Sequence, residues 1–212
     1  MRNKLTAGVL CLTLCLLTLC TPVFADKISF TDVPANAWEA PYVYELASRK
    51  VVSGFGDGTF GPNLPVQRCE YAKMLVGLVP LPLSESLVSP YADVPRDQWY
   101  FPYVNSCLKY IPGYTVNGTL QFRPEWDATR EDVATALVKV KKINLEPYSD
   151  AESYLRERFS DVDTISTHNR IYIAAAVDKG YLTGDQEGTF RGSALITRAE
   201  VSAILCRAFP RK

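Results

Sequence analysis

The sequence is poor in histidine, the residue most often used in acid–base catalysis and a frequent metal ligand. It contains a single histidine, His168, which lies in a polar stretch without a recurring cysteine or serine partner. The chain has no His and Cys pairs at zinc-ligand spacing, no G-x-S-x-G turn and no glycine-rich phosphate loop. These patterns are typical of common nucleophilic, zinc-dependent and phosphoryl-transfer enzymes. We therefore expect no catalytic activity, no cofactor and no metal.

An excess of charge of one sign is also lacking. The 23 lysines and arginines balance the 23 aspartates and glutamates. Only two of these charges, Arg2 and Lys4, lie in residues 1–25, so the rest of the chain has 21 basic and 23 acidic residues and a net charge of −2. A nearly neutral surface does not attract nucleic acid or anionic lipid electrostatically. Neither is an expected partner.

Long apolar runs are confined to residues 1–25. The run Val9–Leu19 follows a short basic stretch and precedes a cleavage-site pattern that ends at Ala25, as in a signal peptide. It is shorter than the about 20 residues of a membrane-spanning helix. We expect cleavage after Ala25, export, and no membrane span in the mature chain. Lipidation at Cys20 is the alternative, which the bulky Leu19 before it disfavours.

What the sequence does contain is one motif written three times. An aromatic residue, a small residue, an aspartate and a valine recur at Phe30–Val33, Tyr91–Val94 and Phe159–Val162. An arginine follows each aspartate after 36, 37 and 37 residues, at Arg68, Arg130 and Arg198. Because each repeated unit must bury its apolar face against its neighbours, a repeat determines the architecture of the whole chain.

Each copy has the same internal order of elements. Apolar residues at i, i+1, i+4 and i+5, such as Tyr42, Val43, Leu46 and Ala47, predict a first helix. A glycine-rich turn follows, and a second amphipathic helix begins at the arginine. The sequence predicts a mainly α fold with six principal helices. The connectors 80–90 and 141–158 do not resemble flexible linkers, so we expect one compact body, with an additional helical turn at 151–158.

These motifs resemble the S-layer homology family of bacterial cell-envelope modules. Ile196–Glu200 reads I-T-R-A-E, and Gly54–Pro62 matches the family's G-x-x-D-G-T-F-x-P loop. The resemblance divides the chain into unit one (30–79), unit two (91–140) and unit three (159–209). It implies that three helix-loop-helix repeats form a pseudo-threefold body with grooves between neighbours.

The resemblance also implies a function. Modules of this family anchor proteins in the cell wall or S-layer by binding an acidic, typically pyruvylated, secondary cell-wall polysaccharide. The expected role is therefore a non-catalytic anchor outside the cytoplasmic membrane. The alternative is a structural component that packs against other S-layer or envelope proteins and whose glycan grooves are degenerate.

The three arginines are the first candidates for ligand contact. An arginine in the first turn of a helix faces the positive end of the helix dipole, which costs some tenths of a kcal/mol. Three of them at one register suggest an anion held by the guanidinium and free backbone N–H groups together. In the family, the matching arginine contacts the glycan. The alternative is an ion pair with Asp32, Asp93 or Asp161. On the preferred interpretation, replacing these arginines costs well under about 1 kcal/mol of folding free energy.

The other candidates each have a structural interpretation. For the aspartates Asp32, Asp93 and Asp161, hydrogen bonds to nearby backbone are preferred over ligand contact. Trp38 and Trp99 are equally compatible with packing between units and with stacking on a sugar. Gly54 and Gly184 are expected to form turns by supplying positive φ, while also permitting close approach of a glycan.

The copies also differ in ways that bear on the grooves. Thr197 with Glu200, and more weakly Thr129 with Asp132, predict capping boxes, whereas Gln67 predicts a poorer helix start before Arg68. Unit three has Thr167-His168 where the others carry tryptophan, and unit two has an insertion at 112–118. We therefore do not expect the three grooves to be equivalent, and we expect Arg68 to contribute least.

Three cysteines lie outside residues 1–25: Cys69, Cys107 and Cys206. An odd, scattered set predicts no disulfide framework. Cys107 and Cys206 stand where other copies have apolar residues and should be buried, whereas Cys69 is expected to be partly exposed.

Overall fold

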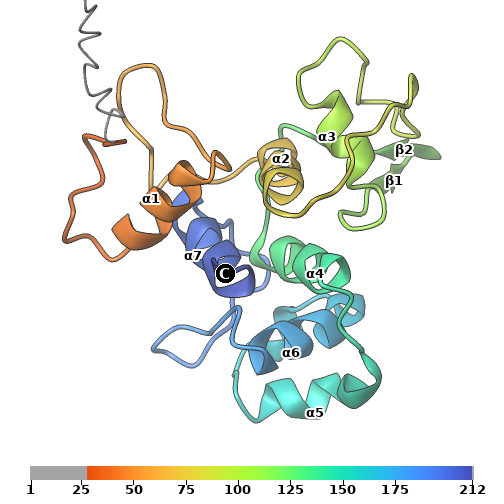
Figure 1. Ribbon diagram of the computed structural model, residues 1–212. Coiled ribbons are helices and arrows are strands. Elements are labelled where there is room, and N and C mark those ends of the chain that lie inside the picture. The colour runs from red at the N-terminus through yellow and green to blue at the C-terminus, as the bar shows by residue number, and fades with distance from the viewer. Residues whose placement is uncertain (1–27, 212) are drawn as a thin grey trace, which may run out of the picture.

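The computed structural model describes residues 28–211, so the expected signal segment lies outside the described residues. The described chain is mainly α-helical, which confirms the predicted fold class (Figure 1). Its elements are α1 (Ala40–Ser48), α2 (Arg68–Leu78), α3 (Phe101–Ser106), β1 (Tyr114–Val116), β2 (Thr119–Gln121), α4 (Arg130–Val140), α5 (Ala151–Arg156), α6 (Arg170–Asp178) and α7 (Arg198–Ala208). No helix among these residues is long and apolar enough to cross a membrane.

Helix α1 of unit one shows how the sequence determines where a helix begins, which face it buries and where it ends. A proline stands in its first turn, where a missing N–H costs nothing and the fixed φ suits a helix. Val43 and Leu46 are completely buried, as the apolar spacing predicts. The helix ends because Lys50, just beyond the C-cap, adopts a left-handed backbone with a φ of 58°.

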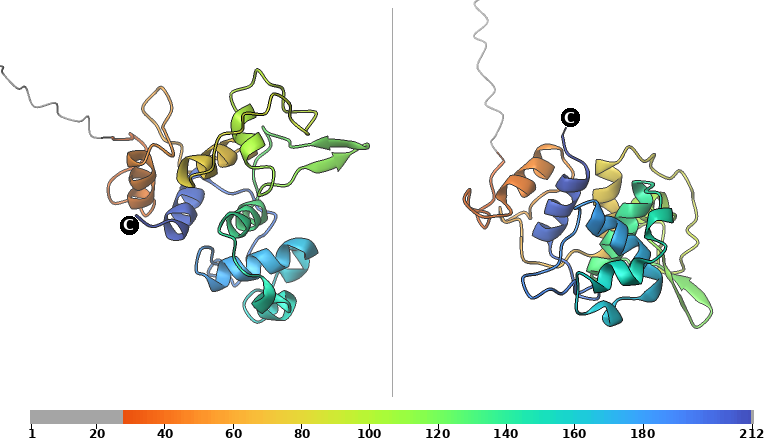
Figure 2. Two further views of the ribbon diagram at one scale, coloured as in Figure 1. Left: turned by 45° about the vertical axis from the view of Figure 1, so that its right-hand side comes forward. Right: turned by 90° about the horizontal axis from the view of Figure 1, so that it is seen from below.

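The principal helix contacts join different units. Helix α1 packs against α7, α2 against α3, and α4 against α6. The second helices α2, α4 and α7 therefore lie around the centre, and the first helices α1, α3 and α6 lie outside them (Figures 1 and 2). Because the apolar face of each second helix is covered by another unit, the units share one core.

The connector between units two and three also packs against this body. Helix α5 lies within it and contacts α6, in agreement with the helical turn expected at 151–158. Leu155 of α5 is completely buried. The connector therefore extends the core around α6.

A closed ring of backbone hydrogen bonds connects the three units at the centre. The N–H of Val66 donates to the carbonyl of Ile196 at 3.0 Å, Ile196 to Ala128 at 3.1 Å, and Ala128 to Val66 at 2.8 Å. All three residues are fully buried, and each lies two residues before the first residue of α2, α4 or α7. The ring places the N-termini of the second helices around an approximate threefold axis.

Candidate ligand-binding grooves

Each of the three arginines crosses to the loop of a neighbouring unit. Arg198, at the start of α7, is 6% exposed, and its Nε and Nη2 donate to the carbonyls of Phe60 and Ser53, both at 2.9 Å. Arg130 makes the same two bonds to Phe190 and Thr183, at 2.9 and 2.8 Å. Arg68 bonds to the carbonyls of Phe122 and Pro112 at 3.0 and 2.5 Å. These side chains fasten unit one to unit two, two to three, and three to one.

The remaining edge of each guanidinium faces a carboxylate. Nη1 of Arg198 lies 3.5 Å from Glu70, and Nη1 of Arg130 lies 3.3 Å from Glu200. Burial lowers the pKa of both arginines, and the neighbouring glutamates oppose that shift. The intramolecular partners are therefore carboxylates of the second helices, and not the motif aspartates named above as the alternative partners.

The helix starts differ from the predicted anion site in one respect. The N–H groups of Arg198 and Ala199 donate to the carbonyls of Leu64 and Pro62 at 2.9 and 3.0 Å, and that of Glu200 donates to the Thr197 hydroxyl at 3.2 Å. The same pattern occurs at α4. Because the first-turn N–H groups already have partners, the predicted combination of guanidinium and free N–H groups is wrong.

The predicted capping boxes are present. Thr197 N donates to Glu200 at 2.9 Å, and Thr129 N to Asp132 at 3.1 Å, with each threonine hydroxyl accepting in return. The N–H of Gln67 likewise donates to the Glu70 carboxylate at 3.0 Å, so the start of α2 keeps this bond. The same carboxylate both closes the helix start and faces an arginine.

The motif aspartates hold the aromatic turn of their own unit. The two carboxylate oxygens of Asp32 accept the N–H groups of Phe60 and Gly61, both at 2.7 Å. Asp93 and Asp161 accept the equivalent pairs at 2.7 to 2.8 Å. The preferred structural interpretation fits this geometry, although the partners are loop N–H groups and not those of a helix start.

Gly54 and Gly184 are needed for close packing, and the expected positive φ is found elsewhere in the turn, at Gly58 and Gly188. A Cβ at Gly54 would lie 2.5 Å from the Thr59 carbonyl oxygen and 2.6 Å from the Phe30 ring. At Gly184 the Phe159 ring would lie 2.4 Å away. A side chain at either position would displace the turn from the motif aromatic.

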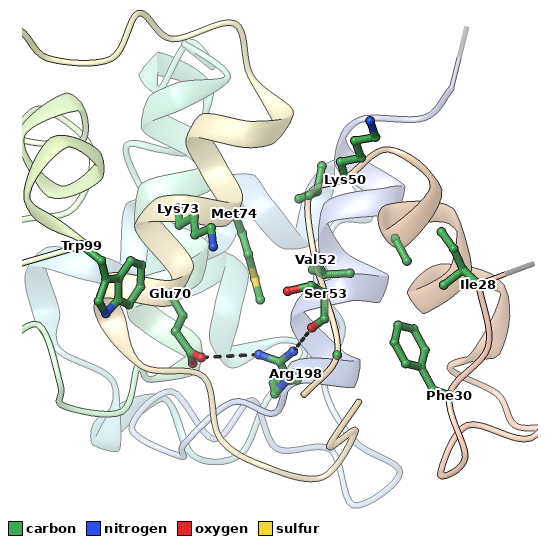
Figure 3. A pocket seen from close by; sticks show the side chains of 13 residues that line it. Ile28, Phe30, Lys50, Val52, Ser53, Glu70, Lys73, Met74, Trp99 and Arg198 are labelled. Atoms are coloured by element: carbon green, nitrogen blue, oxygen red, sulfur yellow. Dashed lines mark hydrogen bonds and ion pairs between the residues drawn. The ribbon is translucent and has the colours of Figure 1, made fainter. Parts of the chain in front are cut away.

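A groove opens between units one, two and three beside Arg198, and we call it the first groove. It is a cavity of about 510 Å³ lined by Gly54, Glu70, Lys73, Trp99 and Arg198, among others (Figure 3). Trp99 comes from unit two and is 50% exposed. The Lys73 ammonium lies 5.5 Å from the centre of its ring. The first groove thus combines an exposed aromatic face with cationic groups.

A second groove repeats this arrangement beside Arg130. This second groove, a cavity of about 180 Å³, is lined by Trp38, Arg130, Gly184, Glu200 and Arg207, among others. Trp38 comes from unit one and is 59% exposed. Trp38 and Trp99 are therefore exposed side chains at grooves between units, and neither is a core residue.

The corresponding position beside Arg68 is occupied by the chain itself. Tyr114, in the hairpin β1–β2 of unit two, accepts a hydrogen bond from Nη1 of Arg68 at 3.2 Å. The guanidinium also lies 4.9 Å from the centre of the Tyr114 ring and 3.0 Å from Asp132. Arg68 is 1% exposed. The sequence showed the insertion at 112–118 but not which residues it would contact. The contact of Tyr114 with Arg68 was therefore not predicted.

The described residues contain no group of His, Cys, Asp and Glu that could hold a metal ion. The three cysteines in this part of the chain are free. Cys107 is buried as expected, but Cys69 is also buried, because α2 begins beneath the loop of unit two. Cys206 is half-buried, less than expected. Burial raises the pKa of the Cys69 and Cys107 thiols to about 12.

Comparison with known families identifies two of these segments. The family model of the S-layer homology domain matches residues 29–72 and 158–202. These two matches fall in units one and three. Unit two lies between the matched segments, and its loop holds the hairpin where the others have the glycine-rich turn.

Curated relatives match most of the chain. The exoglucanase XynX of Acetivibrio thermocellus is 26% identical over 183 residues, which cover 86% of this chain and 16% of the relative. The S-layer protein sap of Bacillus anthracis is 27% identical over 192 residues, covering 88% and 22%. An uncharacterized cell wall amidase of the same organism is 29% identical over 210 residues, covering 99% and 37%. The chain thus spans a minor part of these relatives.

Proposed function

We propose that this chain consists of three S-layer homology repeats and acts as a non-catalytic anchor on the bacterial cell surface. Its ligand is an acidic, pyruvylated secondary cell-wall polysaccharide, bound in grooves between units. The observation that carries this proposal is the recurrence of one constellation at two interfaces: an exposed tryptophan, an anchored arginine and a glycine-rich loop, each from a different element. The matches to S-layer homology segments and to an S-layer protein support it.

The first groove has the chemistry for an acidic sugar. The apolar face of a pyranose ring can stack on Trp99, and a ketal-linked pyruvate carboxylate can reach Lys73 and the Nη1 edge of Arg198. The lining of the groove also includes Lys50, so it holds three cationic side chains and the single carboxylate of Glu70. At 3.5 Å, the Arg198–Glu70 pair is long, and a ligand carboxylate can compete for it.

The acidic residues of the grooves support a binding role over a hydrolytic one. A glycosidase needs two carboxyl groups on opposite sides of the scissile bond. Glu70 and Glu200 each accept the N–H of the residue that begins their helix and also face an arginine. Such carboxylates serve the helix starts and the unit interfaces.

We further propose that two of the three interfaces bind glycan. Tyr114 lies against Arg68, and unit three offers Thr167-His168 in place of a tryptophan at that interface. The same observation favours a second candidate function. A chain whose arginines serve chiefly to join units could act as a structural component that packs against other envelope proteins.

The decisive experiment is binding to cell-wall sacculi before and after acid removal of the secondary polymer. The chain from residue 26 on should sediment with untreated sacculi and remain in solution with treated ones. Trp38→Ala and Trp99→Ala should each weaken binding, and the double variant should abolish it. Trp126→Ala is the matched control, because Trp126 is 58% exposed but lines neither groove.

Two outcomes would contradict the proposal. Equal binding to treated sacculi would show that the ligand is another wall component or an envelope protein, and not the secondary polymer. An equal effect of Trp126→Ala would show that exposed aromatic surface in general, and not the two grooves, determines the binding.

A further inference from the structure

A separate cavity of about 370 Å³ lies between the segment that follows α3, the end of α4 with the turn after it, and α6. Its walls are aromatic and apolar, and include Tyr110, Tyr172, Ile143 and Leu145. Three lysines complete the lining, Lys109, Lys139 and Lys142, and we call this cavity the lysine pocket. It shares no lining residue with the first or second groove.

The positive charge of the lysine pocket is not neutralised within the described chain. No carboxylate lines the cavity, and none of the three lysines forms an ion pair among residues 28–211. Other lysines do find partners: Lys179 pairs with Asp178 at 3.1 Å, and Lys141 donates to the Ala208 carbonyl at 2.8 Å. Three like charges around one cavity repel each other, so an anion between them would lower the free energy.

Lys139 is the innermost of these charges. Its side chain is partly buried, and its ammonium lies 5.1 Å from the centre of the Tyr172 ring. Burial lowers the pKa of Lys139, because removal from water disfavours the charged form. The tyrosine face compensates for part of this loss, and a bound anion would compensate for more of it.

The backbone places Lys142 in the pocket at a conformational cost. Its φ is 52°, in the left-handed region where glycine is favoured, just beyond the end of α4. The matching position beyond α6 is Gly180, with a φ of 67°. Glycine would therefore suit the turn after α4 as well, but the lysine side chain would be lost from the cavity.

We propose that the lysine pocket binds a phosphorylated sugar unit. A phosphate monoester carries a charge of about −1.5 to −2 at pH 7 and three strong acceptor oxygens, which suits a cavity lined by three lysines and no carboxylate. Lysine binds phosphate as a point charge, so its ammonium group can donate to any of the phosphate oxygens. The tyrosine rings and the two aliphatic side chains offer apolar surface to the sugar ring. This site does not depend on the grooves.

The test is a calorimetric titration of the chain from residue 26 on with glucose 6-phosphate at low salt, alongside glucose and inorganic phosphate. Glucose 6-phosphate should bind, glucose should not, and inorganic phosphate should bind more weakly. Lys139→Gln and Lys142→Gly should each weaken binding by roughly three- to tenfold. Lys142→Gly relieves the left-handed strain, so its effect cannot be attributed to unfolding.

Lys179→Gln is the matched control, because this exposed lysine lies outside the cavity, and it should leave affinity unchanged. Trp38→Ala and Trp99→Ala should also have no effect, which separates this site from the grooves. Wild-type affinity in both Lys139→Gln and Lys142→Gly would overturn the proposal. So would equal binding of glucose and glucose 6-phosphate. Equal affinity for inorganic phosphate would refute the sugar-binding role of the tyrosine walls.

Discussion

Replacing Arg198 by alanine should destabilise the whole protein. The guanidinium of Arg198 donates to two carbonyls of unit one, lies 4.6 Å from the centre of the Phe60 ring, and faces Glu70. Its side chain is 7% exposed, so water cannot readily replace these contacts. The substitution would leave the carbonyl groups of Phe60 and Ser53 without their donor, and would open a void between units three and one.

The expected loss in the free energy of unfolding follows from these contacts. A buried polar group that loses its partner costs about 1 to 3 kcal/mol, and breaking a buried ion pair from one side costs about 3 to 5 kcal/mol. These contributions overlap, so we expect a total loss of about 3 to 5 kcal/mol. For a domain of this size the melting temperature should fall by roughly 6 to 20 °C. The helix dipole alone predicts a loss well under about 1 kcal/mol, so the two accounts differ clearly.

The assay is urea unfolding followed by circular dichroism, with the chain from residue 26 on. Arg207→Ala is the matched control, because Arg207 is an exposed arginine on the same helix and should change stability by less than about 0.5 kcal/mol. Arg198→Lys should give an intermediate loss, since an ammonium cannot bond both carbonyls in the geometry of a guanidinium. An Arg198→Ala variant as stable as Arg207→Ala would refute the structural role.

The remaining predictions concern the same interfaces. Arg68→Ala should be the mildest of the three arginine substitutions for polymer binding, because Tyr114 covers its groove, yet among the most destabilising, because Arg68 is 1% exposed. Calorimetry should show one unfolding transition, since the principal helix contacts join different units; three separable transitions would contradict this. Cys69 and Cys107, each with a thiol pKa raised to about 12, should stay protonated and unreactive toward a thiol reagent at pH 8 until the chain unfolds, and rapid native labelling of either would contradict their burial.

The features that the sequence predicted well are those encoded locally. A capping box needs only a threonine and an acidic residue three positions apart, and Thr197 with Glu200 forms one. The spacing of Val43 and Leu46 defines a buried helix face without reference to any partner. Recurrence of the motif then indicated that the units bury their faces against each other.

The errors arise where a partner comes from another unit. The position of Arg198 at a helix start is visible in the sequence, but its acceptors, Phe60 and Ser53, lie 138 and 145 residues away. Likewise, Cys69 is buried by a loop of unit two. The periodicity within one unit indicates which face of a helix is apolar. It does not indicate which neighbouring unit covers a polar residue of that helix.

The glycines show a different limit of prediction from the sequence. A run of three glycines within five residues predicts a turn, but the turn can place its left-handed residue at more than one of them. The structure uses Gly58 for positive φ and keeps Gly54 free of a side chain for contact with Phe30. Only the packing of the turn against the motif aromatic distinguishes the two requirements.

The structural role of the arginines and their proposed role in binding are compatible, because a guanidinium has more donors than the interface uses. Two carbonyls hold Nε and Nη2 of Arg198, so the group is fixed in position before any ligand arrives. A fixed group loses little side-chain entropy on binding, which otherwise costs about 0.5 to 1.5 kcal/mol for each side chain immobilised. Its Nη1 edge is held only by the 3.5 Å pair with Glu70. At Arg68 the corresponding edge already contacts Tyr114 and Asp132. On the proposed function, the same anchoring prepares Arg198 for an acidic ligand, and we expect a purely structural role for Arg68.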